Sequence, residues 1–198
     1  MKNVLNTDLT GKVAVVTGAG GVLCSQFAAV LARAGAKVAL LDINEEAVRA
    51  VAQAICEEGG TARAYRCDVL SAETCRQVAD QVQSDLGPCD ILINGAGGNN
   101  PRATTDKEYY FEGDLDAEVK SFFDLDADGV SFVFNLNFLG TLLTTQAFAV
   151  DMLETGGCIV NISSMNAYTP LTKIPAYSGA KAAVSNFTQW LAGHFANC

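Results

Sequence analysis

The segment Tyr-Ser-Gly-Ala-Lys, late in the sequence, places a tyrosine and a lysine four residues apart. Residues at this spacing share one face of a helix, so Tyr177 and Lys181 are predicted to lie side by side. An ammonium next to a phenol favours the phenolate, which makes a tyrosine usable as an acid or base near neutral pH. Ser164 offers a hydroxyl that can hydrogen-bond a carbonyl oxygen. Alone, a Tyr-x-x-x-Lys pair is more often part of a solvated helix face. A catalytic role therefore has to be argued from other segments of the sequence as well.

A second chemical feature is the glycine-rich segment T-G-A-G-G-V-L-C between a run of valines and a run of alanines. A tight turn between a strand and a helix points backbone N–H groups at a pyrophosphate, at the positive end of the helix. Cys24 stands where the dinucleotide fingerprint ends in a glycine that allows close packing of helix on strand. The residues expected to contact a cofactor here are Gly18, Gly20, Gly21, Val22 and Leu23.

Asp42 ends the next apolar run, 24 residues after Gly18. A carboxylate at this place accepts hydrogen bonds from the ribose hydroxyls of adenosine and repels a 2′-phosphate. The residues that follow, Ile43 and Asn44, include no arginine that would accommodate such a phosphate. The sequence therefore favours NAD over NADP.

These residues need a framework, and the chain alternates short apolar runs with helical patterns. Strands that are apolar throughout indicate a parallel sheet covered on both faces, and right-handed crossovers then give a doubly wound, Rossmann-type α/β fold. Ligands bind at the carboxyl ends of such strands. The predicted strands are 12–18, 37–42, 62–69, 89–97 and 157–164, and the longer predicted helices are 25–35, 44–60, 71–86, 130–153 and 176–196.

The composition limits the classes of function. The chain has 198 residues, enough for one domain, with a net charge of −9; nucleic acid binding needs a basic face, so no nucleic acid partner is expected. No signal peptide or apolar run of membrane-spanning length is visible, so we expect a cytoplasmic protein without a membrane partner. The seven cysteines include no C-x-x-C pair, which indicates reduced thiols rather than a metal site.

Seven segments, in order, resemble the short-chain dehydrogenase/reductase family over nearly the whole chain: TGAGGVLC, LLD, CDV, NGAG, NFLG, NISS and YSGAK. Longer segments, such as SSMNAYTPLTKIPAYS and FVFNLNFLGTLL, look like the D-mannonate oxidoreductase, or fructuronate reductase, branch. That resemblance implies an oxidoreductase that interconverts a sugar-acid hydroxyl and ketone with NAD(H). The alternatives are another polyol or sugar reductase, and an NAD-binding module without catalysis.

The resemblance also implies a role for each matching residue. Tyr177 would be the acid/base and would also contact the cofactor. Lys181 would hold the nicotinamide ribose and activate the tyrosine, and Ser164 would orient the substrate oxygen. Asn137 would support a proton relay. The remaining cofactor contacts would be Asp68 and Val69 at the adenine and Asn94, Gly95 and Ala96 along the cleft, with Gly95 where a second asparagine is more usual. A substrate carboxylate could use Arg102 or Lys173, among polar loop residues that also include Asn99, Asn100 and Asn166.

Two stretches depart from the family pattern. An insert at about 99–129 carries a net charge of −7 between Asp106 and Asp128, and we expect a flap over the substrate site, anchored by Phe111, Phe122 and Phe123. Its D-L-D-A-D-G segment imitates a calcium loop, but the twelfth position is Asn135 rather than glutamate. The family also continues beyond residue 198, so we expect a single Rossmann domain that lacks its last strands and helices, exposes the edge of its fifth strand, and forms a homo-oligomer.

Overall fold

The computed structural model describes residues 7–198, which divide into two compact units. Within the described residues, the first unit comprises 7–96, 141–162 and 197–198, and the second comprises 97–140 and 163–196. Each unit is described by itself. The expectation of a single domain stays a prediction.

The first unit contains a five-stranded parallel sheet in the order β3-β2-β1-β4-β5. This order reverses direction at β1, as a doubly wound sheet does. In this part of the chain, β3 and β5 are the edge strands. The strands are β1 (Val13–Thr17), β2 (Lys37–Asp42), β3 (Thr61–Arg66), β4 (Ile91–Asn94) and β5 (Cys158–Asn161).

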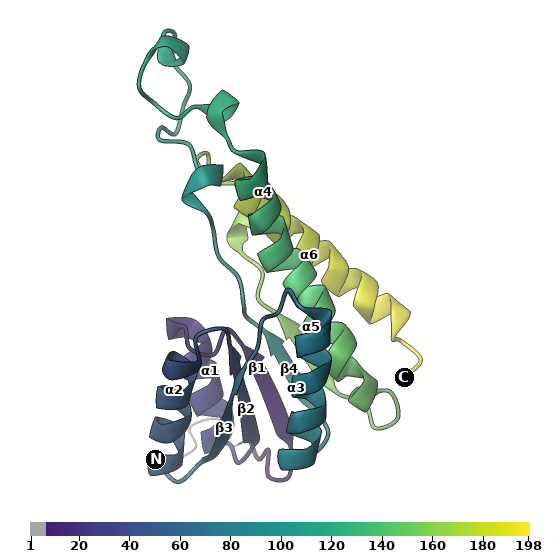
Figure 1. Cartoon of the computed structure of the whole chain (residues 1–198). Helices are drawn as coiled ribbons and strands as arrows, with labels where there is room; N and C mark the ends of the chain where they lie inside the picture. The colour runs from purple at the N-terminus through teal and green to yellow at the C-terminus, as the bar shows by residue number, and fades with distance from the viewer. Residues whose placement is uncertain (1–6) are drawn as a thin grey trace. The chain divides into compact units, whose positions relative to one another are not determined.

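Successive residues of β1 point to opposite faces of the sheet, and both faces are covered, which explains why the strand is apolar throughout (Figure 1). On one face, Ala14 and Val16 pack with helices α1 (Val22–Arg33) and α2 (Glu45–Glu57). On the other face, Val13 and Val15 pack with α3 (Ala72–Asp85) and with α5 (Gly140–Phe148). The predicted Rossmann-type sheet with helices on both faces is confirmed.

Two helices of the first unit begin with a side-chain cap. Asn44 accepts a hydrogen bond from Ala47 N at the start of α2, and Ser71 accepts one from Thr74 N at the start of α3. Each cap satisfies one of the N–H groups that a helix leaves unpaired at its first turn. The loops after β2 and β3 are thereby fixed next to the carboxyl edge of the sheet.

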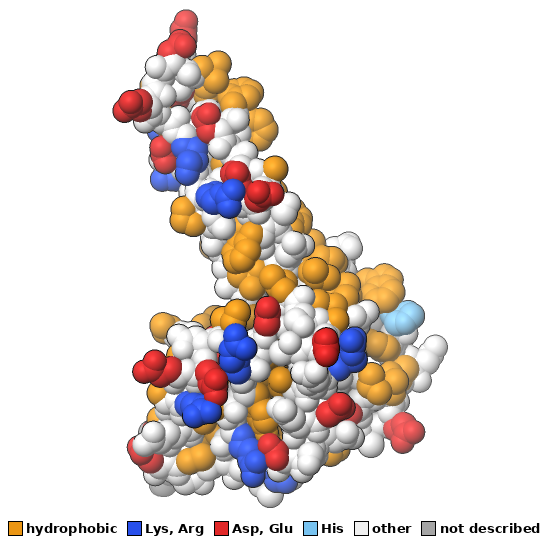
Figure 2. All heavy atoms as spheres, in the orientation of Figure 1, with side chains coloured by type: hydrophobic (Ala, Val, Ile, Leu, Met, Phe, Trp, Pro, Cys, Tyr) orange, Lys and Arg blue, Asp and Glu red, His pale blue; other side chains and the backbone are white. Residues whose placement is uncertain are grey.

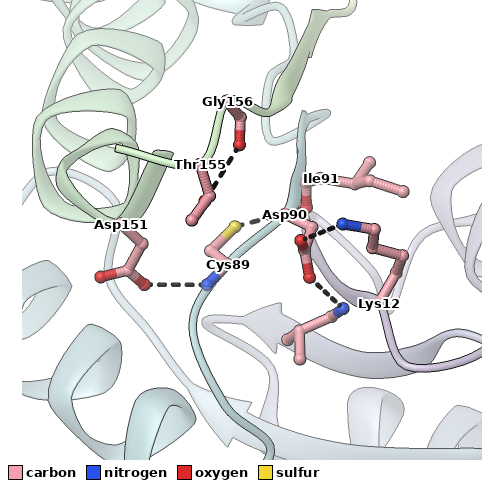
Figure 3. Close-up of polar contacts among 8 residues, drawn as sticks. Lys12, Cys89, Asp90, Ile91, Asp151, Thr155 and Gly156 are labelled. Carbon is pink, nitrogen blue, oxygen red and sulfur yellow. Dashed lines mark hydrogen bonds and ion pairs between the residues drawn. The ribbon is translucent and has the colours of Figure 1, made fainter. Parts of the chain in front are cut away.

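At the amino-terminal ends of the strands, polar contacts join the start of β4 to its neighbours (Figure 3). Asp90 pairs with Lys12 Nζ at 2.7 Å and accepts a hydrogen bond from Val13 N at 2.9 Å. Cys89 N donates to Asp151 Oδ2 at 2.8 Å. Burial raises the pKa of the Cys89 thiol to about 12. These contacts join the start of β4 to β1 and to Asp151 at this end of the sheet.

Helical backbone runs from Ala127 to Met152, and it combines α4 (Ala127–Phe134), a π-helical turn η4 (Asn135–Leu139), α5 and a final 3₁₀ turn η5 (Ala149–Met152). By length and mean hydropathy it could cross a membrane. A core helix passes the same test, and buried polar side chains on this one, such as Thr144, are hydrogen-bonded inside the protein. These contacts account for the helix as part of a protein interior.

The second unit is built around α4, η4 and the last helix, α6 (Pro175–His194). Ala176 and Ala180 of α6 pack against Val133 of α4 and against Ala103. Short 3₁₀ turns occupy the loops: η1 (Pro101–Ala103), η2 (Asp114–Asp116), η3 (Phe122–Asp124) and η6 (Met165–Ala167).

Candidate active site

The glycine turn of the first unit follows β1 directly. Gly18 has a φ of +67°, a conformation that favours glycine, and a β-carbon there would lie 2.9 Å from the backbone of Ala96. Gly21 N donates to Gly18 O at 3.0 Å, which closes the turn. The turn is therefore tight for two reasons, its backbone conformation and the close approach of the segment that follows β4.

Helix α1 starts at Val22 with Gly21 as its N-cap. Among the described residues, no side chain caps this helix and no acid lies in its first turn, whereas α2 and α3 are capped by Asn44 and Ser71. An uncapped helix start, approached through glycines, can present N–H groups and a positive dipole end to a phosphate. Val22 is 89% exposed and Leu23 is exposed as well. The turn thus has the properties that a pyrophosphate site requires.

Asp42 ends β2 with both carboxylate oxygens engaged by backbone. Its Oδ2 accepts a hydrogen bond from Gly20 N at 2.9 Å, and its Oδ1 accepts one from Asn44 N at 2.9 Å. A β-carbon on Gly20 would lie 3.1 Å from Oδ2, so the glycine allows the carboxylate to reach the turn. The neighbouring Ile43 is exposed. A negative charge is therefore fixed at the position where the sequence predicted the adenosine ribose.

The other predicted adenine contacts follow β3. Asp68 Oδ1 accepts a hydrogen bond from Leu70 N at 2.9 Å, which holds the loop before α3. Val69 is buried. Asp68 therefore has a structural role in this loop besides the contact predicted from the sequence.

Asn94, at the end of β4, directs its side chain into the protein. Its Nδ2 donates to Thr145 Oγ1 at 2.9 Å and to Asn161 Oδ1 at 2.8 Å, and its Oδ1 accepts from Thr144 Oγ1 at 2.6 Å. Buried amides need this full pairing. The side chain thus joins β4 to β5 and α5, and the two threonines are supporting residues that the sequence analysis missed.

Gly95 and Ala96 continue from β4 and are held by β1. Both backbone N–H groups donate to Thr17 Oγ1, at 3.0 and 3.1 Å. The hydroxyl of Thr17 therefore fixes the two predicted cleft residues next to the glycine turn. This role of Thr17 depends on the pairing of β1 with β4, which brings the ends of these two strands together.

In the second unit, Tyr177 and Lys181 lie one turn apart near the start of α6. The Lys181 side chain is only 5% exposed, and its Nζ lies 5.7 Å from the centroid of the Tyr177 ring. Pro175 occupies the first turn, where a proline is compatible with the helix. A desolvated ammonium next to a phenol stabilises the negative charge of a phenolate. The predicted adjacency of the two side chains is present.

Asn137 lies in the π-helical turn η4 and is fully buried. Gly140 N donates to Asn135 O, five residues earlier, so the turn is wider than an α-helical one. The amide Nδ2 of Asn137 donates to Gly98 O at 2.7 Å and to Val133 O at 2.8 Å, while Oδ1 accepts from Gly98 N at 3.2 Å. Asn137 therefore holds the loop after β4. Such π turns are frequent at functional sites.

Ser164 lies beyond the end of β5, in a loop, and not in the strand that the sequence predicted. Its Oγ accepts a hydrogen bond from Asn166 N at 3.2 Å. The preceding Ser163 is a residue that the sequence analysis missed: its Oγ donates to Lys181 O at 3.0 Å and lies 2.6 Å from Ser185 Oγ. These contacts fix the loop of Ser164 to the helix of Tyr177 and Lys181, so the second unit brings the two parts of the predicted catalytic set together.

The two cations proposed for a substrate carboxylate differ in their surroundings. Arg102 pairs with Asp126 at 2.7 Å and lies 3.8 Å from Asp128. Lys173 is half-buried and takes part in none of the ion pairs formed within residues 7–198; its carbonyl accepts a hydrogen bond from Thr105 N. A cation without an internal counter-ion is better suited to an external carboxylate. Asn99 and Asn100 are used within the loop, through Thr104 Oγ1 and Arg102 N.

The acidic insert differs from the prediction in its anchor. Phe122 and Phe123 are each 68% exposed and Phe111 is exposed too, so the expectation that these rings anchor the insert is wrong. Instead, buried Asp114 pairs with Lys107 at 2.7 Å and accepts a hydrogen bond from Phe111 N. Figure 2 shows both acidic and hydrophobic side chains at the surface of this segment. Polar pairs inside the insert, not its aromatic rings, determine its conformation.

The calcium-like segment is explained by helix capping. Asp124 accepts hydrogen bonds from the backbone and hydroxyl of Ser121, and Asp126 caps α4 by accepting one from Gly129 N. Within residues 7–198, no three His, Cys, Asp or Glu side chains gather as a metal site would require. Two of the three aspartates in D-x-D-x-D-G thus stabilise the starts of helical turns.

A model of the short chain dehydrogenase family matches residues 12–197. The chain belongs to the short-chain dehydrogenase family. As a member of it, the chain is an oxidoreductase. An uncharacterized oxidoreductase of Haemophilus influenzae is 59% identical over 98% of this chain and 68% of its own length. The uncharacterized oxidoreductase UxuB of Bacillus subtilis is 48% identical over 97% of this chain and 68% of its own length.

Two solved structures share the fold. A provisionally named D-mannonate oxidoreductase from Haemophilus influenza, solved with bound NAD, has 58% sequence identity and a TM-score of 0.93 over 96% of this chain and 68% of its own. An NAD⁺-bound xylitol dehydrogenase has 32% identity and a TM-score of 0.83 over 94% of this chain and 66% of its own. The family resemblance that the motifs indicated is confirmed.

Proposed function

We propose that this chain is an NAD(H)-dependent oxidoreductase that interconverts the secondary alcohol and ketone of a sugar acid such as D-mannonate and D-fructuronate. The observation that carries the proposal is the buried Lys181 ammonium one helical turn from the Tyr177 phenol. This pair supplies a proton donor and acceptor, and family membership supplies the class of reaction.

The first unit fits NAD. Gly18, Gly20 and Gly21 allow the tight turn before the uncapped start of α1, whose N–H groups would hold a pyrophosphate. Asp42, with its negative charge fixed by Gly20 N and Asn44 N, would accept hydrogen bonds from an adenosine ribose and disfavour a 2′-phosphate. The remaining proposed contacts are Val22, Leu23, Ile43, Asp68, Val69, Asn94, Gly95 and Ala96. When bound, the cofactor would supply the hydride acceptor for oxidation as NAD⁺ and the hydride donor for reduction as NADH.

The chain's own residues handle the proton and the orientation. In the oxidation direction, the phenolate of Tyr177 accepts the hydroxyl proton; in the reduction direction, its phenol returns that proton to the carbonyl oxygen. Lys181 stabilises the phenolate by its charge, and the Ser164 hydroxyl donates a hydrogen bond to the substrate oxygen. Asn137 acts by position, since its amide is engaged with Gly98 and Val133.

A sugar acid is favoured over a neutral polyol by two observations. The structural relative at 58% identity bears the name of a D-mannonate oxidoreductase. Lys173 precedes Tyr177 by four residues and pairs with no acid in the described part of the chain, so it is suited to bind a carboxylate. A D-threitol dehydrogenase from Mycolicibacterium smegmatis, 34% identical, represents the polyol alternative.

The test is a matched panel of substrates assayed with NAD(H) and NADP(H). D-Fructuronate and D-fructose differ in a carboxylate, as do D-mannonate and D-mannitol. We expect turnover of the acids with NAD(H), at least about tenfold above the neutral sugars in kcat/KM, because a charged hydrogen-bonded contact contributes about 1.5–3 kcal/mol. Preference for the neutral sugars would favour the polyol alternative. NADH binding without turnover of any of these compounds would favour the non-catalytic module.

Self-association is part of the proposal, because α6 presents an aromatic row. Phe187, Trp190 and His194 stack along the helix, and Trp190 is 56% exposed. Large exposed apolar patches mark interaction sites. Sedimentation of the protein should reveal a homo-oligomer, and Trp190→Glu should weaken it.

A further inference from the structure

Two residues far apart in the sequence share one small volume in the first unit. Cys24 lies in the first turn of α1, and Gly95 directly follows β4. A β-carbon added to Gly95 would lie 2.2 Å from Cys24 Sγ, far inside any real contact distance, and 3.0 Å from Thr17 O. The sulfur of Cys24 therefore occupies the space that a side chain at position 95 would need.

Gly95 is required for its lack of volume and not for its backbone conformation. Its φ is not among the positive φ angles found for glycines in residues 7–198, whereas that of Gly18 is +67°. An L-residue could adopt the backbone of Gly95, but its side chain would meet sulfur. Cys24 is buried and packs in the core with Ala14, Val16 and Ala28, so the sulfur has little freedom to move aside.

The shared volume is connected to the glycine turn by two contacts. Gly95 N and Ala96 N both donate to Thr17 Oγ1, and Thr17 immediately precedes Gly18. The backbone of Ala96 approaches Gly18 so closely that a β-carbon on Gly18 would lie 2.9 Å away. A displacement of Gly95 would therefore change the position of the turn that is proposed to hold the pyrophosphate.

We propose that Cys24 and Gly95 form one positioning pair, in which the side chain of Cys24 requires that position 95 has none. The pair sets the approach of α1 to the end of β4 and thereby the geometry of the cofactor turn. This inference rests on the proposed binding of NAD.

The test is a double-mutant cycle with Gly95→Ala, Cys24→Gly and the double variant. Gly95→Ala should raise the Kd for NADH, measured by fluorescence titration, by tenfold or more. Cys24→Gly should stay within threefold of the wild type. The double variant should recover most of the lost affinity, apart from the residual contact with Thr17 O. In turnover, Gly95→Ala should raise the KM for NADH and leave kcat within twofold.

A control distinguishes the effect of removing the Cys24 sulfur from the general destabilisation that a glycine causes in a helix. Gln26 is exposed on the same helix, so Gln26→Gly weakens α1 without touching position 95. Combined with Gly95→Ala, it should rescue nothing. If Gly95→Ala is too unstable for titration, the thermal midpoints of the variants are compared instead. Adding Cys24→Gly to Gly95→Ala should raise the midpoint toward that of the wild type, and adding Gln26→Gly should not.

Two results would overturn the pair: wild-type affinity of the single variant Gly95→Ala, or a double variant no better than Gly95→Ala. A wild-type protein that binds no NADH would instead contradict the proposed function. The thermal cycle would then still decide whether the pair exists, so the two failures are distinguishable.

Discussion

Gly97 lies directly against Asn137: a β-carbon at position 97 would be 2.6 Å from Asn137 Oδ1 and 3.2 Å from Lys181 Nζ. Two side chains of the proposed catalytic set are thus positioned against a glycine. Gly97→Ala should lower kcat/KM by about 10- to 100-fold, because small displacements of catalytic groups have effects of this size. The adjacent Gly98 would place a β-carbon only in ordinary contact, 3.8 Å from Leu136. Equal activities of Gly97→Ala and Gly98→Ala would show that the glycine is not needed.

Asp42 should determine the choice between NAD and NADP. Asp42→Asn keeps an oxygen that can accept the Gly20 N–H but removes the charge. We expect the ratio of kcat/KM for NADP to that for NAD to rise about tenfold or more, which corresponds to about 1.4 kcal/mol. Glu57→Gln, on the exposed last turn of α2, is the matched control. An unchanged ratio would assign the preference to other residues.

The Asp42 site also shows how much the sequence could predict. Its place at a strand end, its distance from the glycine turn and the absence of a following arginine are properties of the sequence itself. The same holds for Tyr177 and Lys181, whose adjacency follows from helical spacing. The position of a residue at a strand end and the spacing of two residues in a helix are local properties of the sequence. They can be predicted without tertiary information.

Other parts of the site depend on contacts between distant segments. No sequence pattern indicates that Gly95 meets Cys24 or that Ser163 holds Lys181 O. The contacts of Thr144 and Thr145 with Asn94 could not be predicted either. The π turn at Asn137 was also not predicted, since one extra residue in a helical turn leaves the apolar pattern nearly unchanged. The aromatic rings of the insert were assigned as anchors on composition alone, which does not determine which side of a loop faces solvent.

Lys173 should distinguish acids from neutral sugars. Lys173→Met should raise the KM for D-fructuronate about 10- to 100-fold, since a hydrogen bond to a charged group contributes about 1.5–3 kcal/mol. The KM for D-fructose should not change. Arg102→Met is the control: because Arg102 is paired with Asp126, its replacement should change the KM for the acid less than threefold. A larger effect of Arg102→Met would reverse the assignment.

The thiols should differ in reactivity toward a maleimide at pH 7.5. Cys56, Cys158 and Cys198 are exposed and should react in the native protein, whereas Cys24, Cys67, Cys75 and Cys89 are buried. The pKa of Cys89 is raised to about 12 by burial, so its reactive thiolate is absent at this pH in the folded state and forms only as pH approaches 12. Mass spectrometry should detect three labels in the native protein and seven in urea. Fewer than seven in urea would contradict reduced thiols.

Tyr177→Phe tests the central claim most directly, because it removes only the proton-carrying oxygen. The measurement is the rate of NADH oxidation with D-fructuronate, alongside a fluorescence titration with NADH and with Tyr109→Phe, an exposed tyrosine of the insert, as control. We predict that turnover falls by about 10²- to 10⁴-fold, the contribution of general acid–base catalysis, while the Kd for NADH stays within twofold of the wild type. A Tyr177→Phe variant that retains most of its turnover would contradict the account.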